Sequence, residues 1–79
     1  MLEDISNKVI ECIADKTQML PESITHESNL KNDLDLDSLD LVELEFTLER
    51  EYNIPLNFTE GAVPEKVGDI INMIAKKIA

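Results

Sequence analysis

Residues 33–52 read DLDLDSLDLVELEFTLEREY, and within this stretch an irregular segment gives way to a helix. The alternating Leu and Asp at its start are compatible with a strand, but from residue 39 to residue 52 apolar side chains recur at helical spacing. We therefore predict a loop followed by a helix over 39–52. Ser38, or alternatively Asp37, is expected to be the N-cap, because a side-chain oxygen there accepts a hydrogen bond from an amide of the first turn.

The predicted helix carries two apolar stripes, whereas the core of a small bundle requires only one. The first stripe recurs at steps of three and four and comprises Leu41, Leu44, Leu48 and Tyr52. The second lies about 100° away around the helix axis and comprises Leu39, Val42 and Phe46. The residues leave two interpretations open: both stripes are buried as one wide apolar face, or the second is exposed among acidic side chains as a docking surface.

Two further amphipathic helices are predicted, one on each side of this helix. The first spans about 2–16, with its apolar face formed by Leu2, Ile5, Val9, Cys12 and Ile13. The last spans about 65–78, with its apolar face formed by Val67, Ile70, Ile71, Ile74 and Ile78. Prolines and a glycine between residues 52 and 65 leave room only for a short helical turn at about 59–63, with Thr59 as its expected cap.

Residues 17–37 form the one long stretch without periodicity, and we predict a loop there. Its apolar side chains are expected to pin it to the core: Met19, Leu20, Ile24, Leu30, Leu34 and Leu36. The predicted fold class is all-α. It is a small four-helix bundle of three long helices and one short one, with a long loop between helices one and two, in a single domain over 1–79.

Charge and length narrow the possible functions. The 79 residues include 17 Asp and Glu but 7 Lys and Arg, for a formal net charge of −10. Eight of those acids and a single base fall within residues 33–51, a local charge of −7. So acidic a chain is not expected to bind nucleic acid or anionic membranes, and its partners should present basic surfaces. A chain this short also excludes a large catalytic machine.

Other features favour a cytoplasmic protein that does not insert into membranes and acts as a monomer. No apolar run approaches the roughly 20 residues that span a bilayer. The first residues, MLEDISNK, lack the basic segment of a signal peptide. The single cysteine, Cys12, cannot form an internal disulfide. Because Cys12 lies on an apolar stripe, it is expected to be a small buried hydrophobe rather than a reactive thiol.

Catalytic and metal-binding patterns are weak. The only histidine, His26, lies in the loop without a local partner and is expected to be solvated. Asp33, Asp35 and Asp37 have the spacing that opens an EF-hand loop. Positions 6 and 12 of such a loop require Gly and Glu, and here they are Ser38 and Leu44. No catalytic residue and no true calcium site are therefore expected, although an acidic interaction or divalent-cation-binding module with unmodified Ser38 remains the alternative function.

The motif Asp37-Ser38-Leu39-Asp40, followed by Val-Glu-Leu at 42–44, resembles the modification site and second helix of the acyl carrier proteins. The similarity extends over the whole chain in length, acidity and order of predicted helices. It implies a non-catalytic carrier with 4'-phosphopantetheine, taken from coenzyme A, attached to Ser38 by a phosphopantetheinyl transferase. Acyl intermediates would travel on this arm as thioesters between enzymes of fatty acid or related biosynthesis, such as that of polyketides or specialised lipids.

The resemblance also implies that the helix after Ser38 is a recognition surface. Acyl synthases, acyltransferases and the modifying enzyme, each with a basic docking surface, would contact the apolar residues Leu39, Val42 and Phe46. The same enzymes would contact the charged residues Asp37, Asp40, Glu43 and Glu49. The remaining apolar faces would line a core that can open to shelter an acyl chain, formed in part by Ile5, Val9, Ile13, Val67, Ile71 and Ile74.

Asp35 and Leu36, which precede the motif, depart from the family pattern. The family commonly has Gly followed by Ala where this chain has Asp35 and Leu36. Asp tolerates a left-handed backbone better than most residues, so the loop is expected to survive the change. The departure leaves open a specialised carrier, including one for an activated amino acid, in place of the general fatty-acid carrier.

Overall fold

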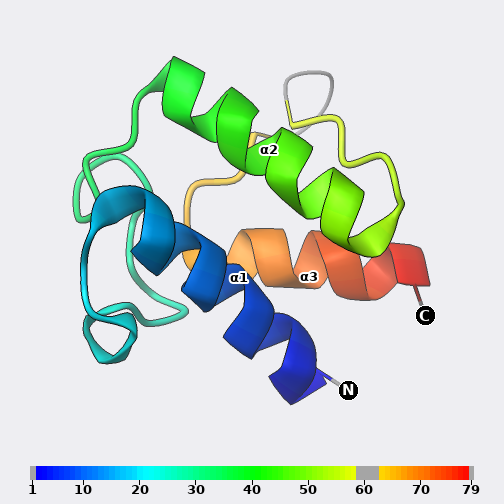
Figure 1. Ribbon diagram of the computed structural model, residues 1–79, viewed down its shortest axis with the longest axis horizontal. Coiled ribbons are helices and arrows are strands. Elements are labelled where there is room, and N and C mark those ends of the chain that lie inside the picture. The colour runs from blue at the N-terminus through cyan, green and yellow to red at the C-terminus, as the bar shows by residue number, and fades with distance from the viewer. Residues whose placement is uncertain (1, 59–62, 79) are drawn as a thin grey trace.

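The computed structural model describes residues 2–58 and 63–78, and within them the fold is all-helical (Figure 1). It contains α1 (Leu2–Thr17), the 3-10 turn η1 (Pro21–Ser23), α2 (Ser38–Tyr52) and α3 (Val67–Ile78). The described residues contain no strand, only an isolated antiparallel bridge between Asn29 and Lys66. The predicted all-α class is therefore confirmed.

Helix α1 is central, because it packs against both α2 and α3. In Figure 1 it crosses in front of α3, with α2 above them. The α1 face predicted from helical spacing is buried at Ile5, Val9 and Ile13. It meets the buried leucines of α2 and the buried Val67, Ile70, Ile71 and Ile74 of α3 in one core. Apolar spacing on each helix thus accounts for the three-helix arrangement.

The long loop between α1 and α2 is held to this core as predicted, with one exception. Ile24, Leu30, Leu34 and Leu36 are buried, and Met19 is partly buried against them. The expectation for Leu20 is wrong, because 65% of this side chain is exposed. Leu20 has an extended backbone immediately before Pro21 begins the 3-10 turn, and its side chain is left in solvent.

The loop is also tied by its backbone to the beginning of α3. The Leu30 N–H donates to the Glu65 carbonyl at 2.8 Å, and the Val67 N–H donates to the Ser28 carbonyl at 3.1 Å. Helix α3 begins at Val67 rather than at the predicted residue 65. A carboxylate oxygen of Asp69 accepts hydrogen bonds from the N–H groups of both Glu65 and Lys66, each at 3.0 Å, so those two residues precede the helix.

The short helical turn predicted at 59–63, with its cap at Thr59, lies outside the described residues except for Val63. Three α-helices are shown, and the predicted count of four is not. No helix within 2–58 and 63–78 is both long and apolar enough to cross a membrane.

Candidate functional site

The start of α2 places Ser38 at the first helical position, one residue after the N-cap. The N-cap is Asp37, whose backbone is extended. Its carboxylate accepts a hydrogen bond from the Asp40 N–H at 2.8 Å, and its own N–H donates to the Asp40 carboxylate at 3.1 Å. The prediction that Ser38 is the N-cap is therefore wrong, and the alternative prediction, Asp37, is confirmed. The reciprocal bonds form a capping box that occupies Asp37 and leaves the Ser38 side chain out of the cap.

Ser38 is exposed, and among the described residues its hydroxyl has no hydrogen-bond partner. The first N–H groups of a helix have no acceptor within the helix itself, and the partial positive charge of the helix dipole lies at this end. The capping box satisfies the N–H groups of Asp37 and Asp40. The N–H groups of Ser38 and Leu39, in the same first turn, are not satisfied by the capping box.

A compact turn over 29–36 determines where this helix starts. The Asn29 side-chain oxygen accepts from the N–H groups of Lys31 and Asn32, and the Asp33 carboxylate accepts from the Asn29 N–H at 2.7 Å. The turn closes where the Leu36 N–H donates to the Leu30 carbonyl at 2.9 Å. With the side chain of Leu36 buried, the next two residues are directed outward at the protein surface.

Asp35 occupies the one strained position of this turn. Its φ is +56°, in the left-handed region that glycine adopts most easily. The expectation that the loop accommodates Asp35 in a left-handed conformation is confirmed, and Leu36 after it is buried rather than disruptive. The turn therefore delivers Asp37 and Ser38 to the helix start without a glycine.

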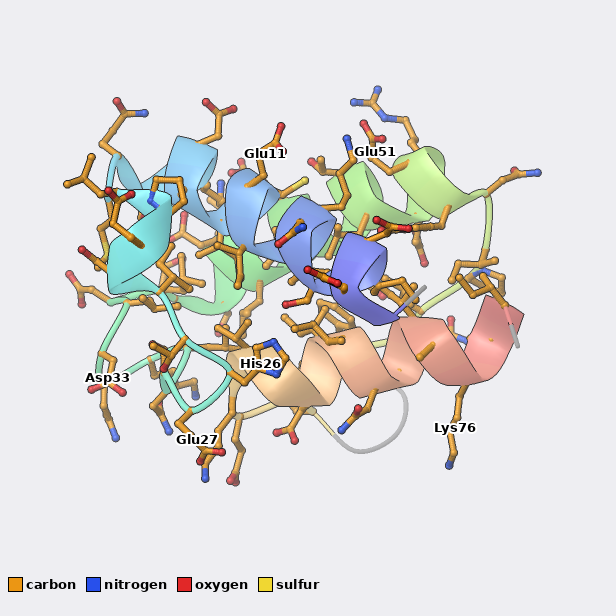
Figure 2. All side chains as sticks on the ribbon, turned by 90° about the horizontal axis from the view of Figure 1, so that it is seen from below. Glu11, His26, Glu27, Asp33, Glu51 and Lys76 are labelled. Atoms are coloured by element: carbon orange, nitrogen blue, oxygen red, sulfur yellow. The ribbon has the colours of Figure 1, made fainter. Side chains whose placement is uncertain are left out.

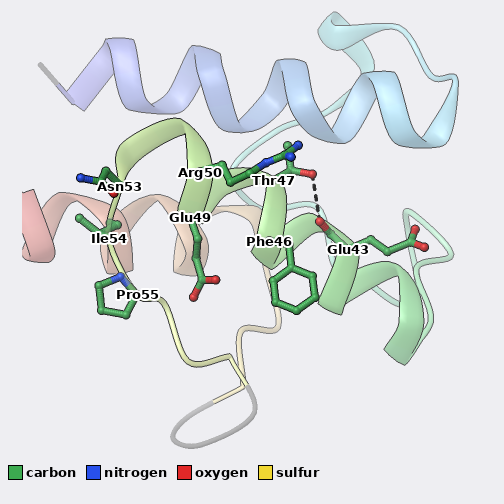
Figure 3. Close-up of a pocket in the computed structure, with 8 residues that line it drawn as sticks. All are labelled: Glu43, Phe46, Thr47, Glu49, Arg50, Asn53, Ile54 and Pro55. Atoms are coloured by element: carbon green, nitrogen blue, oxygen red, sulfur yellow. Dashed lines mark hydrogen bonds between the residues drawn. The ribbon is translucent and has the colours of Figure 1, made fainter.

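The two stripes of α2 differ in exposure. Leu41, Leu44 and Leu48 of the first stripe are buried, and Tyr52 is half-buried. In the second stripe Leu39 is 66% exposed and Phe46 is 61% exposed, while Val42 is half-buried. Figure 3 shows Phe46 projecting from α2 on the side away from α1. The interpretation in which both stripes are buried is therefore wrong.

Two acidic side chains of α2 share one cation. Lys16, at the end of α1, makes an ion pair with Glu43, and its ammonium lies 3.7 Å from a carboxylate oxygen of Asp40. The hydrogen bonds with Asp37 lower the pKa of Asp40, and Lys16 contributes in the same direction. The hydrogen bond to Glu43 raises the pKa of Lys16, so the Lys16 ammonium stays charged at neutral pH.

Comparison with known proteins gives consistent matches. A family model described as the phosphopantetheine attachment site matches residues 7–61. The acyl carrier protein of Amoebophilus asiaticus is 36% identical over 99% of this chain and 98% of its own length. The chain belongs to the acyl carrier protein family. The acyl carrier protein of Porphyromonas gingivalis is 34% identical over 98% of this chain and 99% of its own. The acyl carrier protein of Lactobacillus acidophilus is 40% identical over 91% of this chain and 90% of its own length.

As a member of the acyl carrier protein family, the chain is a carrier and not an enzyme. Proteins of this family hold a covalent 4'-phosphopantetheine group and serve acyl biosynthesis. The prediction of a non-catalytic, phosphopantetheine-dependent carrier is confirmed.

One acid expected on the docking face of this carrier protein has a structural contact. The Glu49 carboxylate accepts a hydrogen bond from the Leu56 N–H at 2.9 Å. Glu45, which we did not single out from the sequence, makes the equivalent bond to the Phe58 N–H at 2.8 Å and is only 9% exposed. The two glutamates thereby hold residues 56–58 against α2. The sequence feature that could have indicated this role of Glu45 is its position on the buried stripe, four residues after Leu41.

An open groove lies beside the exposed stripe of the acyl carrier protein (Figure 3). Phe46 and Glu49 line it near its middle, and Ile54 and Pro55 line the end after α2. Arg50, the single base among the acids of α2, also lines this groove. The groove thus runs from Glu43, Phe46 and Glu49 of α2 past the end of the helix.

The remaining candidates from the sequence do not assemble a second site in this acyl carrier protein. Asp33 and Asp37 bind backbone N–H groups, and no cluster of three metal-ligating side chains occurs within the described residues. His26 lies on the loop and is exposed (Figure 2). Its ring nitrogen lies 2.6 Å from the Ser6 hydroxyl on α1, so it does have a polar neighbour. Burial raises the pKa of the half-buried Cys12 thiol, which disfavours the reactive thiolate.

Proposed function

We propose that Ser38 carries the 4'-phosphopantetheine group of this acyl carrier protein. The observation that carries the proposal is the capping box, because Asp37 caps α2 and leaves the exposed Ser38 hydroxyl without a partner among the described residues. A phosphate attached there would face the N–H groups of the first turn and the positive end of the helix dipole. The residues present therefore fit the group.

The attachment reaction requires little from the chain itself. The Ser38 oxygen forms a bond to the phosphorus of the 4'-phosphopantetheine moiety of coenzyme A, and the bond from that phosphorus to 3',5'-ADP breaks. The hydroxyl proton goes to a base of the phosphopantetheinyl transferase, so Ser38 needs no histidine of its own. When bound, the group supplies a terminal thiol that carries acyl groups. The chain contributes an accessible hydroxyl at a rigid helix start.

We also propose that α2 is the surface that partner enzymes bind. Leu39, Val42 and Phe46 would supply the apolar contacts, since their exposure on a helix rimmed by acids is typical of a docking surface. The charged contacts would come from Asp37, Asp40, Glu43 and Glu49. The partners are the phosphopantetheinyl transferase and the acyl synthases and acyltransferases, each with a basic docking surface.

The finer structural expectations belong to the same proposal. We place the fourth, short helix at 59–63, a single domain over 1–79, a monomeric state and a cytoplasmic location. Light scattering of the purified protein tests the monomer. The cargo is proposed to be an acyl chain of fatty acid or related biosynthesis, and mass analysis of the species attached in cells tests that.

Intact-mass measurement tests the attachment residue. We expect the apo chain, incubated with coenzyme A, Mg²⁺ and a broad-specificity phosphopantetheinyl transferase, to gain the mass of one phosphopantetheine group. Ser38→Ala should gain none. The matched control is Ser23→Ala, which removes another exposed serine, in the 3-10 turn, and should be modified like wild type. A full mass gain in Ser38→Ala would refute the assignment.

A further inference from the structure

Lys16 connects the end of α1 to the acids that follow Ser38. Its ammonium forms an ion pair with Glu43 and lies 3.7 Å from an Asp40 carboxylate oxygen. Asp40 and Glu43 are three residues apart and therefore lie on one side of α2. One cation thus bridges two of the four acids proposed to contact partner enzymes.

The Lys16 side chain is only partly exposed. Its side chain is 22% exposed, compared with 35% for Asp40 and 55% for Glu43. It lines one hollow with Leu34 and Leu36 of the loop and another with Leu44 and Thr47 of α2. The lysine therefore reaches the acids from α1, and both acids keep part of their side chains in solvent, where a partner would approach.

This placement alters the charge that a partner meets beside Ser38. Asp37, Asp40 and Glu43 would present three negative charges, and Lys16 offsets one of them. A basic side chain of the partner must also share Asp40 and Glu43 with a cation that is already bound to them. Charges within about one Debye length, roughly 8 to 10 Å at physiological salt, act directly on such an encounter.

We propose that Lys16 is a specificity-determining residue: it competes with the basic side chains of the phosphopantetheinyl transferase for Asp40 and Glu43, and so limits association at Ser38. The inference rests on the proposed function of Ser38 and α2. Electrostatic complementarity acts mainly on association rates, so Lys16 affects kcat/KM for the carrier substrate and leaves kcat unchanged.

The direct test is Lys16→Met, which keeps the apolar stem and removes the charge. We expect kcat/KM for phosphopantetheinylation of the apo chain to rise about threefold at low ionic strength, and the rise to disappear at high salt. The matched control is Lys76→Met. It changes the net charge equally, but Lys76 lies at the opposite end of the molecule from Asp33 and the 29–36 turn (Figure 2), so a much smaller rise is expected.

A double-mutant cycle shows whether Lys16 acts through its acids. In the Glu43→Gln background Lys16 has lost one of its two partners, and Lys16→Met should then change kcat/KM by a factor that differs from its effect in wild type. Equal factors in the two backgrounds would overturn the proposed competition for Glu43.

The remaining outcomes are also decisive. If wild type is modified but Lys16→Met has an unchanged kcat/KM, or one that falls while its circular dichroism remains native, then Lys16 does not limit association and this inference alone fails. Should Lys16→Met lose its fold, Lys16→Gln provides the same comparison. A wild type that gains no mass would instead overturn the proposed function, and the inference with it.

Discussion

Asp37 and Ser38 are adjacent residues with separate tasks at the start of α2. Asp37 satisfies the helix end through its reciprocal bonds with Asp40, and Ser38, the proposed attachment residue, stays out of the cap. Either residue type is a good N-cap, so the pattern around 37–38 could not decide between them. The choice depends on the 29–36 turn, whose hydrogen bonds set the backbone at Asp37, and those bonds are not visible in helical periodicity.

Removing the cap oxygen should weaken the fold without removing the attachment residue. We expect Asp37→Ala to lower the free energy of unfolding by about 1 kcal/mol, because the Asp40 N–H loses its acceptor. Asp37→Asn keeps an oxygen at that position and should retain most of the stability. Urea denaturation of the three proteins measures the difference, and equal losses in both variants would contradict the capping role.

Asp69 should make part of the stability dependent on pH. Hydrogen bonds from the N–H groups of Lys66 and Glu65 lower its pKa from the ordinary 3.8. A carboxyl whose pKa is depressed on folding contributes stability above its unfolded pKa, and this is lost as pH falls through the folded value. Asp69→Asn should therefore lose less stability than wild type between neutral pH and strongly acidic pH, measured by urea denaturation across that range. Identical pH profiles would contradict this.

At the scale of the element, α2 is a helix with one face in the core and one in solvent. For α1 and α3 the sequence carries one stripe each, and spacing predicted the burial of most of its residues. The exceptions among the described side chains are Ile78, which is 38% exposed at the end of α3, and Cys12, which is half-buried. For α2 the spacing alone left two interpretations open: both stripes are buried, or the second is exposed. Which stripe faces inward depends on the packing of α1 and the 53–58 segment against it, a tertiary feature that residues 39–52 do not contain.

Matched substitutions on the two faces of α2 should separate folding from docking. Leu44→Ser places a hydroxyl and a cavity in the core, since Leu44 is 1% exposed, and should cost about 3 kcal/mol or more. Phe46→Ser should change stability by only about 0.5 kcal/mol, because the ring is mostly in solvent. Thermal melts measure the stability of each variant, and modification rates measure docking.

The proposed docking role of Phe46 predicts a further difference between these variants. Phe46→Ser should remain folded yet be modified or acylated more slowly, because the partner loses an apolar contact. A large drop in melting temperature for Phe46→Ser would mean that this face belongs to the core. Unimpaired transfer in a folded Phe46→Ser would remove the ring from the docking surface.

At the scale of the whole molecule, the charge is unevenly distributed. The stretch 33–51 carries −7 of the net −10, whereas α3 ends in Lys76 and Lys77. Composition alone indicated that partners are basic, and the local acid count indicated the surface. The sequence could not show that Lys16 lies against two of those acids. Lys16 and Glu43 are 27 residues apart and meet only through the packing of α1 on α2.

Modification should therefore depend strongly on salt. Raising the ionic strength shortens the Debye length from about 30 Å at 0.01 M to about 8 Å at 0.15 M. We expect kcat/KM for the transferase to fall over this range, with circular dichroism showing that the chain stays folded throughout. Stopped-flow or mass-based kinetics at several salt concentrations measures the slope. A rate independent of salt would contradict electrostatic recognition.

The bonds from Glu45 and Glu49 to the Phe58 and Leu56 N–H groups have a consequence for hydrogen exchange. These two amides lie outside any helix, yet each is bound to a carboxylate of α2 and belongs to a residue at most 2% exposed. Because both side chains belong to the same core as α2, we expect the two amides to be freed for exchange only when α2 itself opens. Deuterium should therefore enter Leu56 and Phe58 as slowly as the middle of α2, and much more slowly than the exposed Asn57 between them.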